Sequence, residues 1–162
     1  MANLFEPEFD LDHEHEGFNY RRAKLGAQAG AERLGASLYE IPPGEALFPY
    51  HAHVNNEEML LVLSGRPHLR SPDGWRELKE GEVVALPVGP GGAHQVQNRS
   101  DQVARLLVVS QMNAPDIVFQ PDSGKFLAAT RPPGGTSKEG DLFGAFKLDS
   151  EVDYWEGESP PS

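Results

Sequence analysis

The sequence predicts an all-β protein, a sandwich or a barrel, on the basis of three observations. Apolar runs of strand length recur between turn-forming residues over most of the chain. Glycine (17 residues) and proline (14) together make up about 19% of the 162 residues, which favours many turns. No stretch has a convincing helical period, because Gly26, Gly30 and Gly35 interrupt the one short candidate near Leu25. Short strands joined by frequent turns are typical of closed β architectures.

The predicted strands end at residues that favour turns. The first ends at Pro42-Pro43, and Gly65 ends a nearly continuous apolar run whose two faces we expect to be buried. Asp73-Gly74 is predicted to close a hairpin. The predicted strands cover residues 37–41, 58–64, 67–71, 75–79, 82–86, 94–98, 105–111, 116–120, 126–130 and 142–148.

A chain of 162 residues suits one domain, which can bury most of its apolar surface around a single core. Within it, residues 1–35 are expected to form an N-terminal arm with the first strands, and residues 36–120 the core of the barrel. Residues 121–162 are expected to add C-terminal strands and a tail that pack on the barrel. The arm carries scattered aromatic side chains, so it could dock on the body of the protein or on a second subunit.

Composition excludes several classes of function. The formal net charge of −11 would repel a nucleic acid or an anionic membrane surface, so we expect neither as a partner. The chain has no cysteine, which excludes a disulfide or a thiolate metal site. The N-terminus is acidic and lacks the apolar core of a signal peptide, and no apolar run approaches the length of a membrane span. These features predict a cytoplasmic protein.

Three histidines and a glutamate have a spacing typical of a metal site. His51 and His53 are two residues apart, so on a strand both side chains point to the same face. Glu58 follows a turn-prone Asn-Asn pair and begins the next strand, which can bring it to the same ion. His94 begins a strand that is distant in sequence, and a jelly roll places such strands side by side. The sequence therefore predicts one divalent metal ion on these four side chains.

The residues around these ligands resemble the two motifs of the cupin superfamily. Both motifs occur in the expected order and at about the expected separation. Two gaps differ: the gap before His51 is one residue longer than usual, and four residues instead of two separate Gly89 from His94. The matching residues are Gly44, His51, His53, Glu58 and Gly65 in the first motif, and Gly81, Pro87, Gly89, His94 and Asn98 in the second.

This resemblance covers roughly residues 36–120 and implies a double-stranded β-helix, also called a jelly-roll barrel. It also implies that the four side chains named above bind a metal, and that a small molecule is the ligand. Cupins commonly pair through sheet edges or exchanged arms, so the resemblance implies a homodimer. The whole chain is similar to a bacterial subgroup of cupins that carries the name of sugar-phosphate isomerases. The segments 34–39, 121–125 and 153–155 carry this narrower match.

Other side chains are candidates for the site on weaker grounds. Glu57 competes with Glu58 as the ligand, but Glu58 stands the expected six residues before Gly65 and opens the apolar strand. Arg131 and Lys125 could meet an anionic substrate. Apolar side chains in a barrel are more often plain core than pocket, and the one polar candidate is expected to form hydrogen bonds near the site or at a turn. The candidate pocket residues are Phe48, Tyr50, Leu60, Val62, Val96 and Asn98.

The predicted ligands define the chemistry that the site could perform. Nitrogen and oxygen ligands suit Zn, Mn, Fe, Ni or Cu, and the sequence does not choose among these metals. Four protein ligands on an octahedral ion leave two positions for water or substrate. We expect a metal-dependent isomerase acting on a small polar or sugar-like molecule, although no general base stands out. Two alternatives stay open: a metal-dependent dioxygenase, and a binding module that holds a small ligand without turnover.

Overall fold

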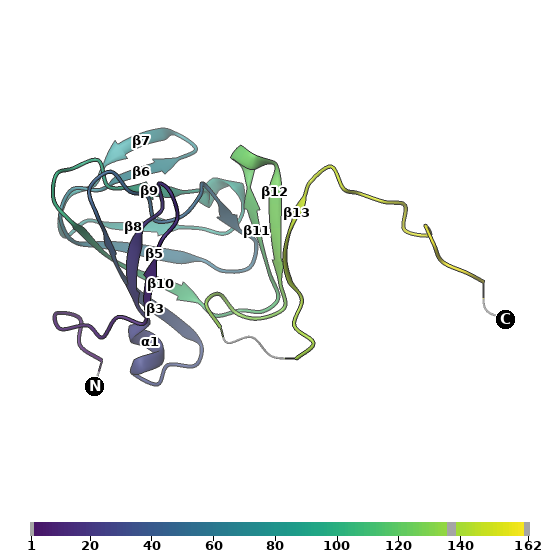
Figure 1. The fold of residues 1–162 in the computed structure, drawn as a ribbon, viewed down its shortest axis with the longest axis horizontal. Helices are drawn as coiled ribbons and strands as arrows, with labels where there is room; N and C mark the ends of the chain where they lie inside the picture. The colour runs from purple at the N-terminus through teal and green to yellow at the C-terminus, as the bar shows by residue number, and fades with distance from the viewer. Residues whose placement is uncertain (1, 136–138, 161–162) are drawn as a thin grey trace.

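The computed structural model describes residues 2–135 and 139–160 and confirms the all-β prediction (Figure 1). Every predicted strand is present, with bounds that differ by at most three residues. Residues 1, 136–138 and 161–162 of the predicted arm, C-terminal region and tail lie outside the described part. No helix among the described residues is long and apolar enough to cross a membrane. The elements are β1 (Leu11–His13), β2 (Tyr20–Ala23), α1 (Leu25–Gln28), β3 (Leu34–Ile41), β4 (Ala52–His53), β5 (Glu58–Ser64), β6 (His68–Ser71), β7 (Gly74–Glu77), β8 (Val83–Leu86), the 3₁₀ turn η1 (Pro90–Gly92), β9 (Gln95–Gln97), β10 (Ala104–Gln111), β11 (Asp116–Gln120), the 3₁₀ turn η2 (Pro121–Ser123), β12 (Lys125–Ala129) and β13 (Phe143–Lys147).

The body of the molecule brings strands that are distant in sequence side by side. Over the described residues, one sheet has the order β1-β2-β3-β10-β5-β8 and a smaller one the order β7-β6-β9. β10 pairs antiparallel with β3 along its whole length, and its other edge pairs with β5. Strand neighbours that are separated by several intervening elements are the topology expected of a jelly roll.

Alternation along the central strands builds the core. In β5, Leu60 and Val62 are 0% and 2% exposed, because alternate residues of a strand share a face. Ile41 of β3 and Leu106 of β10 belong to the same cluster and are fully buried. Burying a side chain of this size stabilises the fold by roughly 1.5–3 kcal/mol. The main apolar cluster is Tyr20, Tyr39, Ile41, Leu47, Leu60, Val62, Leu69, Leu78, Leu86, Val96 and Leu106.

The N-terminal arm docks on the body of its own chain. β1 pairs with β2, and β2 extends the main sheet by pairing with β3. Leu4 and Phe9 pack against a second apolar cluster that contains Leu38. Asp10 holds the arm through an ion pair with Arg22, in which Oδ2 and Nη2 are 2.6 Å apart. Of the two docking modes that the sequence left open, contact with the chain's own body is the one observed.

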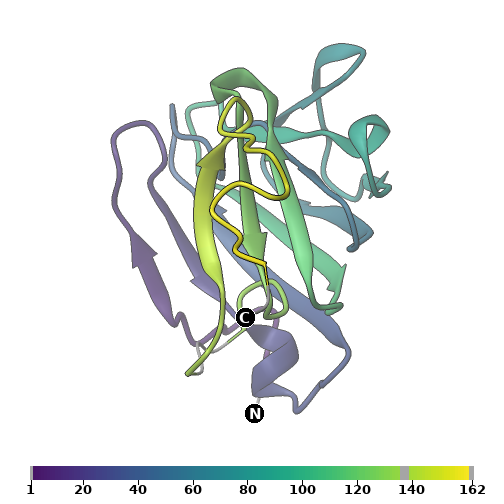
Figure 2. The same cartoon turned by 90° about the vertical axis from the view of Figure 1, so that its right-hand side faces the viewer.

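The C-terminal strands form a separate layer beside the barrel. This sheet has the order β13-β12-β11-β4, and Figure 2 shows its green strands β11 to β13 side by side on the face toward the viewer. Because β4 carries His53, the layer borders the predicted metal site.

The tail beyond β13 differs from the expectation that residues 121–162 pack on the barrel. In Figure 1 it runs away from the body, and Tyr154 and Trp155 are 83% and 72% exposed. Acidic residues flank the aromatic pair of this tail, with Asp149, Glu151 and Asp153 before it and Glu156 and Glu158 after it. These charges favour solvation and are repelled by the acidic body of the protein.

Candidate metal centre

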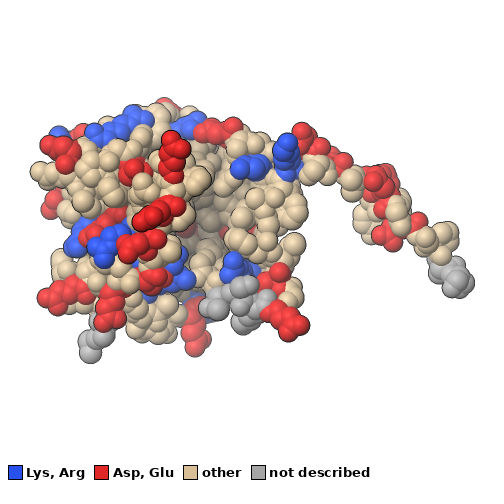
Figure 3. Space-filling model, in the orientation of Figure 1, with Lys and Arg blue, Asp and Glu red and all other residues tan. Residues whose placement is uncertain are grey.

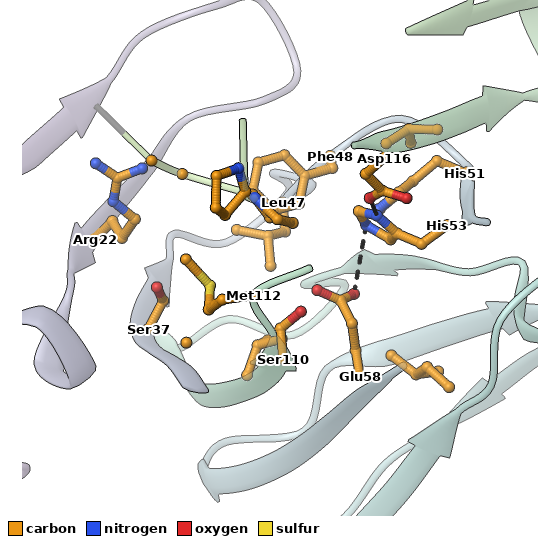
Figure 4. Close-up of a pocket in the computed structure, with 18 of the residues that line it drawn as sticks. Arg22, Ser37, Leu47, Phe48, His51, His53, Glu58, Ser110, Met112 and Asp116 are labelled. Carbon is orange, nitrogen blue, oxygen red and sulfur yellow. Dashed lines mark hydrogen bonds and ion pairs between the residues drawn. The ribbon is translucent and has the colours of Figure 1, made fainter. Parts of the chain in front are cut away.

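The four predicted ligands come from three stretches of chain that meet inside the barrel. His53 lies on β4 and Glu58 begins β5. His51 and His94 precede β4 and β9, and their backbones pair as an isolated antiparallel bridge. The imidazole centroids of these two residues are 4.4 Å apart. Figure 4 shows His51, His53 and Glu58 pointing toward one another at one end of a cavity.

The distances between these side chains are close to those around a shared ion. The potential ligand atoms of His51, His53 and Glu58 all lie within 4.8 Å of one another. Oε2 of Glu58 is 3.4 Å from Nε2 of His94 and 3.8 Å from Nε2 of His53. Two ligands with bonds of about 2.1 Å lie about 3.0 Å apart at a right angle and about 4.2 Å apart when opposite. The atoms of His51, His53 and Glu58 are thus at separations that one ion can bridge, whereas His94 lies outside this group of three and approaches it through Glu58.

Each imidazole is oriented by a hydrogen bond from Nδ1. His51 and His94 each donate to the carbonyl oxygen two residues earlier, at 2.8 Å and 2.9 Å. Nδ1 of His53 donates to Oδ2 of Asp116 at 2.6 Å. Carbonyl and carboxylate oxygens only accept, so the hydrogen lies on Nδ1, and Nε2 of a neutral imidazole keeps its lone pair. Three such nitrogens beside a carboxylate are a suitable donor set for a divalent transition metal.

Burial and neighbouring charges determine the protonation of the centre. Burial, reinforced by His94 and His53, lowers the pKa of His51 to about 3. Burial also opposes the charge of His53, but the hydrogen bond to Asp116 and the charge of Glu58 outweigh it and raise the pKa of His53. For Glu58, burial is outweighed by the nearby imidazoles of His94, His53 and His51, so its pKa is lowered. The centre therefore combines an ionised carboxylate with a neutral imidazole at neutral pH.

Asp116 is a residue of the centre that the sequence analysis did not find. It begins β11 and is 2% exposed. Besides the bond from His53, it accepts a hydrogen bond from the backbone N–H of Asn55 at 3.0 Å. A carboxylate on the distal nitrogen of a metal-binding imidazole fixes the tautomer and orients the ring. Asp116 is 63 residues from His53, and a single aspartate after a proline carries no sequence signal of this role.

The unusually long gap between Gly89 and His94 contains the turn η1. Gly92 ends this turn, and a Cβ at its position would lie 1.6 Å from the carbonyl oxygen of Pro87, so only glycine fits. The carbonyl oxygen of Gly92 accepts the hydrogen bond from Nδ1 of His94 at 2.9 Å. The departure from the usual motif therefore forms the support of one proposed ligand.

The centre opens into a cavity of about 750 Å³ (Figure 4). Three of the predicted pocket residues do not line it. Val62 lies in the core, and Tyr50 stacks against the guanidinium of Arg70 at 4.1 Å. The amide of Asn98 donates to two carbonyl oxygens at a turn. Strand alternation predicts the face of a side chain but not where along the barrel the cavity ends. The three predicted residues that line the cavity are Phe48, Leu60 and Val96.

Comparison with protein families identifies the central region. Residues 37–110 match the family model described as the cupin domain. The chain contains a cupin domain. This match confirms the resemblance drawn from the two motifs and the jelly-roll class that it implied. A comparison with curated proteins found no match.

Solved structures are similar to this chain over most of its length. A candidate sugar phosphate isomerase from Acidithiobacillus ferrooxidans is 26% identical, with a TM-score of 0.74 over 91% of this chain and 88% of its own. A sugar phosphate isomerase of the cupin superfamily from Silicibacter pomeroyi is 22% identical, with a TM-score of 0.76 over 93% and 94%. The polyketide cyclase RemF from Streptomyces resistomycificus is 25% identical, with a TM-score of 0.57 over 68% and 78%. The first two likenesses extend beyond the cupin domain into the arm and the C-terminal layer.

Proposed function

We propose that this cupin holds one divalent metal ion on His51, His53, Glu58 and His94 and isomerises a small polar or sugar-like substrate. The observation that carries the proposal is the common orientation of the three imidazoles, each of which uses Nδ1 for a hydrogen bond and leaves Nε2 for an ion. The names of the similar structures from Acidithiobacillus ferrooxidans and Silicibacter pomeroyi support the reaction class.

The residues of the chain prepare the cavity for this chemistry. A bound divalent ion would supply Lewis-acid polarisation of a substrate carbonyl group. Asp116 holds the ring of His53 in place, and apolar side chains such as Phe48 and Leu60 line the cavity. Burial raises the pKa of Tyr39, which also lines the cavity, so its hydroxyl stays protonated and can donate a hydrogen bond to a substrate oxygen.

Elemental analysis of protein purified without added metal tests the metal part of the proposal. We expect one ion per chain in the wild type, and loss of the ion in His53→Ala and in His94→Ala with an unchanged circular dichroism spectrum. His15→Ala is the matched control, because this histidine lies in an exposed part of the arm. Full metal occupancy in both ligand variants would remove the site as proposed.

A proton-exchange assay tests the reaction class. The metal-loaded protein is incubated in D₂O with a panel of aldoses, ketoses and their phosphates, and products are identified by NMR. Isomerisation predicts deuterium on the carbon beside the carbonyl group, with the same rate in air and under argon. Neither exchange nor an isomerised product with any member of the panel would contradict the isomerase. Turnover that requires oxygen would instead identify the dioxygenase alternative.

The proposal includes a homodimer. Its support is the edge strand β13, whose Phe143 and Phe146 are 55% and 40% exposed, together with the extended aromatic tail. A second chain that covers these apolar side chains would remove them from water. Light scattering after size exclusion measures the mass, and a value near 17.7 kDa would show a monomer.

A further inference from the structure

The cavity carries opposite charges at its two ends. Besides the residues of the metal centre, three cationic side chains line it: Arg22, Lys24 and Arg131. Among its described lining residues, the carboxylates are Glu58 and Asp116, which both belong to the centre. Figure 4 shows Arg22 at the end opposite Glu58 and Asp116. Figure 3 shows the surface hollowed between the barrel and the C-terminal layer, with blue basic side chains at its edge.

Local contacts hold the three cations together, although they come from distant parts of the sequence. Arg22 lies on β2 and Lys24 directly follows this strand, and Asp10 accepts from the guanidinium of Arg22 and from the backbone N–H of Lys24. Nζ of Lys24 donates to the carbonyl oxygen of Gly134 at 2.6 Å. Nη1 of Arg131 donates to the next carbonyl oxygen, that of Gly135, at 2.9 Å. The cationic heads of Lys24, which follows β2, and of Arg131, in the loop after β12, therefore meet at two adjacent carbonyl oxygens.

These contacts leave positive charge and donors for a ligand. Asp10 pairs with Arg22, whereas Lys24 and Arg131 donate to uncharged carbonyl oxygens, so these contacts do not neutralise the charges of Lys24 and Arg131. A guanidinium has five N–H donors and an ammonium has three, and each cation here uses only part of this capacity. The ring of Phe143 lies against the guanidinium of Arg131, with 4.3 Å between the ring centroid and Cζ of the arginine. This contact helps to position the Arg131 side chain. The chain as a whole has a net charge of −11 and repels anions. Binding of an anion would therefore depend on these local cationic side chains.

We infer that Arg22, Lys24 and Arg131 bind an anionic group of the substrate, a phosphate or a carboxylate, at the end of the cavity opposite the metal centre. The inference rests on the proposed function, because it assigns the other end of the same substrate to the metal. β2 and β5 are three strand spacings apart in the main sheet, and the strand register places Arg22 opposite Val62, four residues along β5 from Glu58. The backbones of Arg22 and Glu58 are therefore on the order of 20 Å apart. The substrate is therefore an elongated small molecule with an anionic group at one end and a carbonyl or hydroxyl group at the other.

Titration calorimetry with inorganic phosphate tests the anion site directly. The full-length wild type is compared with the double variant Lys24→Gln/Arg131→Gln, which leaves the ion pair of Arg22 intact. We expect the Kd for phosphate to rise at least about tenfold, since charged hydrogen bonds are lost. The charge-conserving variant Lys24→Arg/Arg131→Lys should retain binding, which separates charge from loosening of the loop. Lys125→Gln is the matched control, because Lys125 lies on β12 outside the cavity lining and should not alter binding.

Repeating the titration on metal-free His53→Ala/His94→Ala protein distinguishes this site from the metal centre. We expect phosphate to bind this protein as it binds the wild type, whether or not the isomerase is correct. Loss of phosphate binding here would place the anion on the metal and overturn the inference, as would wild-type affinity in Lys24→Gln/Arg131→Gln. Succinate in place of phosphate separates the two anions: the tighter ligand identifies the group, and binding of neither overturns the site.

Discussion

Replacing Asp116 with asparagine tests whether the residue behind His53 controls the metal. The aspartate is 2% exposed and accepts hydrogen bonds from Nδ1 of His53 at 2.6 Å and from the backbone N–H of Asn55 at 3.0 Å. An asparagine of the same shape has one acceptor oxygen, so its NH₂ group must face one of these two donors. Either a donor loses its partner, or the proton of His53 moves to Nε2, the atom proposed to bind the ion.

The expected loss of affinity follows from these contacts. A buried donor without an acceptor costs about 1–3 kcal/mol. If the unpaired donor destabilises the metal-bound protein and not the metal-free protein, the Kd for the ion rises by about 5- to 150-fold. Variants of residues that support metal ligands typically weaken metal binding by about 10- to 100-fold, which agrees with this range. We therefore expect the Kd for Zn²⁺ to rise by about tenfold or more in Asp116→Asn.

Competitive titration of Zn²⁺ against a fluorescent chelator measures this Kd. Thermal unfolding in excess chelator checks that the metal-free variant is folded. Asp122→Asn is the matched control, because Asp122 is 54% exposed and its carboxylate pairs with Arg70 away from the centre. The Kd of the Asp122→Asn protein for Zn²⁺ should stay within about twofold of the wild-type value, because an exposed ion pair contributes little. A folded Asp116→Asn protein with the wild-type Kd would refute the reasoning.

Three further predictions concern the turn, the core and the arm. Gly92→Ala should weaken metal binding and lower the melting temperature, because its Cβ would lie 1.6 Å from the Pro87 carbonyl oxygen; Gly91→Ala meets nothing within 4 Å and should change neither. Leu106→Ala should lower the free energy of unfolding in urea by about 2–5 kcal/mol, because this side chain is 0% exposed in the main cluster, and a smaller loss would mean that the cavity collapses. Burial opposes the charge of Asp10, but its arginine partner and backbone donor outweigh it and lower its pKa from the ordinary value of an aspartate. Asp10→Asn should therefore lower the free energy of unfolding by about 0.5–1 kcal/mol at pH 7. This difference from the wild type should disappear as the pH falls through the folded-state pKa of Asp10, and an equal difference at pH 7 and below that pKa would contradict the ionic origin.

Local patterns in the sequence were sufficient to predict the fold class and to select the candidate ligands. Glycine and proline end strands through the limits of their own backbones, so the predicted strand bounds lie within three residues of those observed. His51 and His53 share a face because the side chains of a strand alternate. Glu58 was preferred to Glu57 because it stands six residues before Gly65 and opens the apolar strand, and the structure places Glu58 beside the imidazoles while Glu57 is exposed. The four ligands themselves stay a prediction until a metal is measured.

Only the tertiary structure revealed what supports the site and what lines its far end. Asp116 reaches His53 because β11 pairs with β4, and Arg131 reaches the cavity from the loop that follows β12. Val62, predicted as pocket, is core because the cavity ends before its position. The physical reason is the same in each case. The alternation of a strand depends only on consecutive residues and can be recognised in the sequence. Which strands become neighbours depends on how distant segments pack when the barrel closes and buries their shared apolar surface.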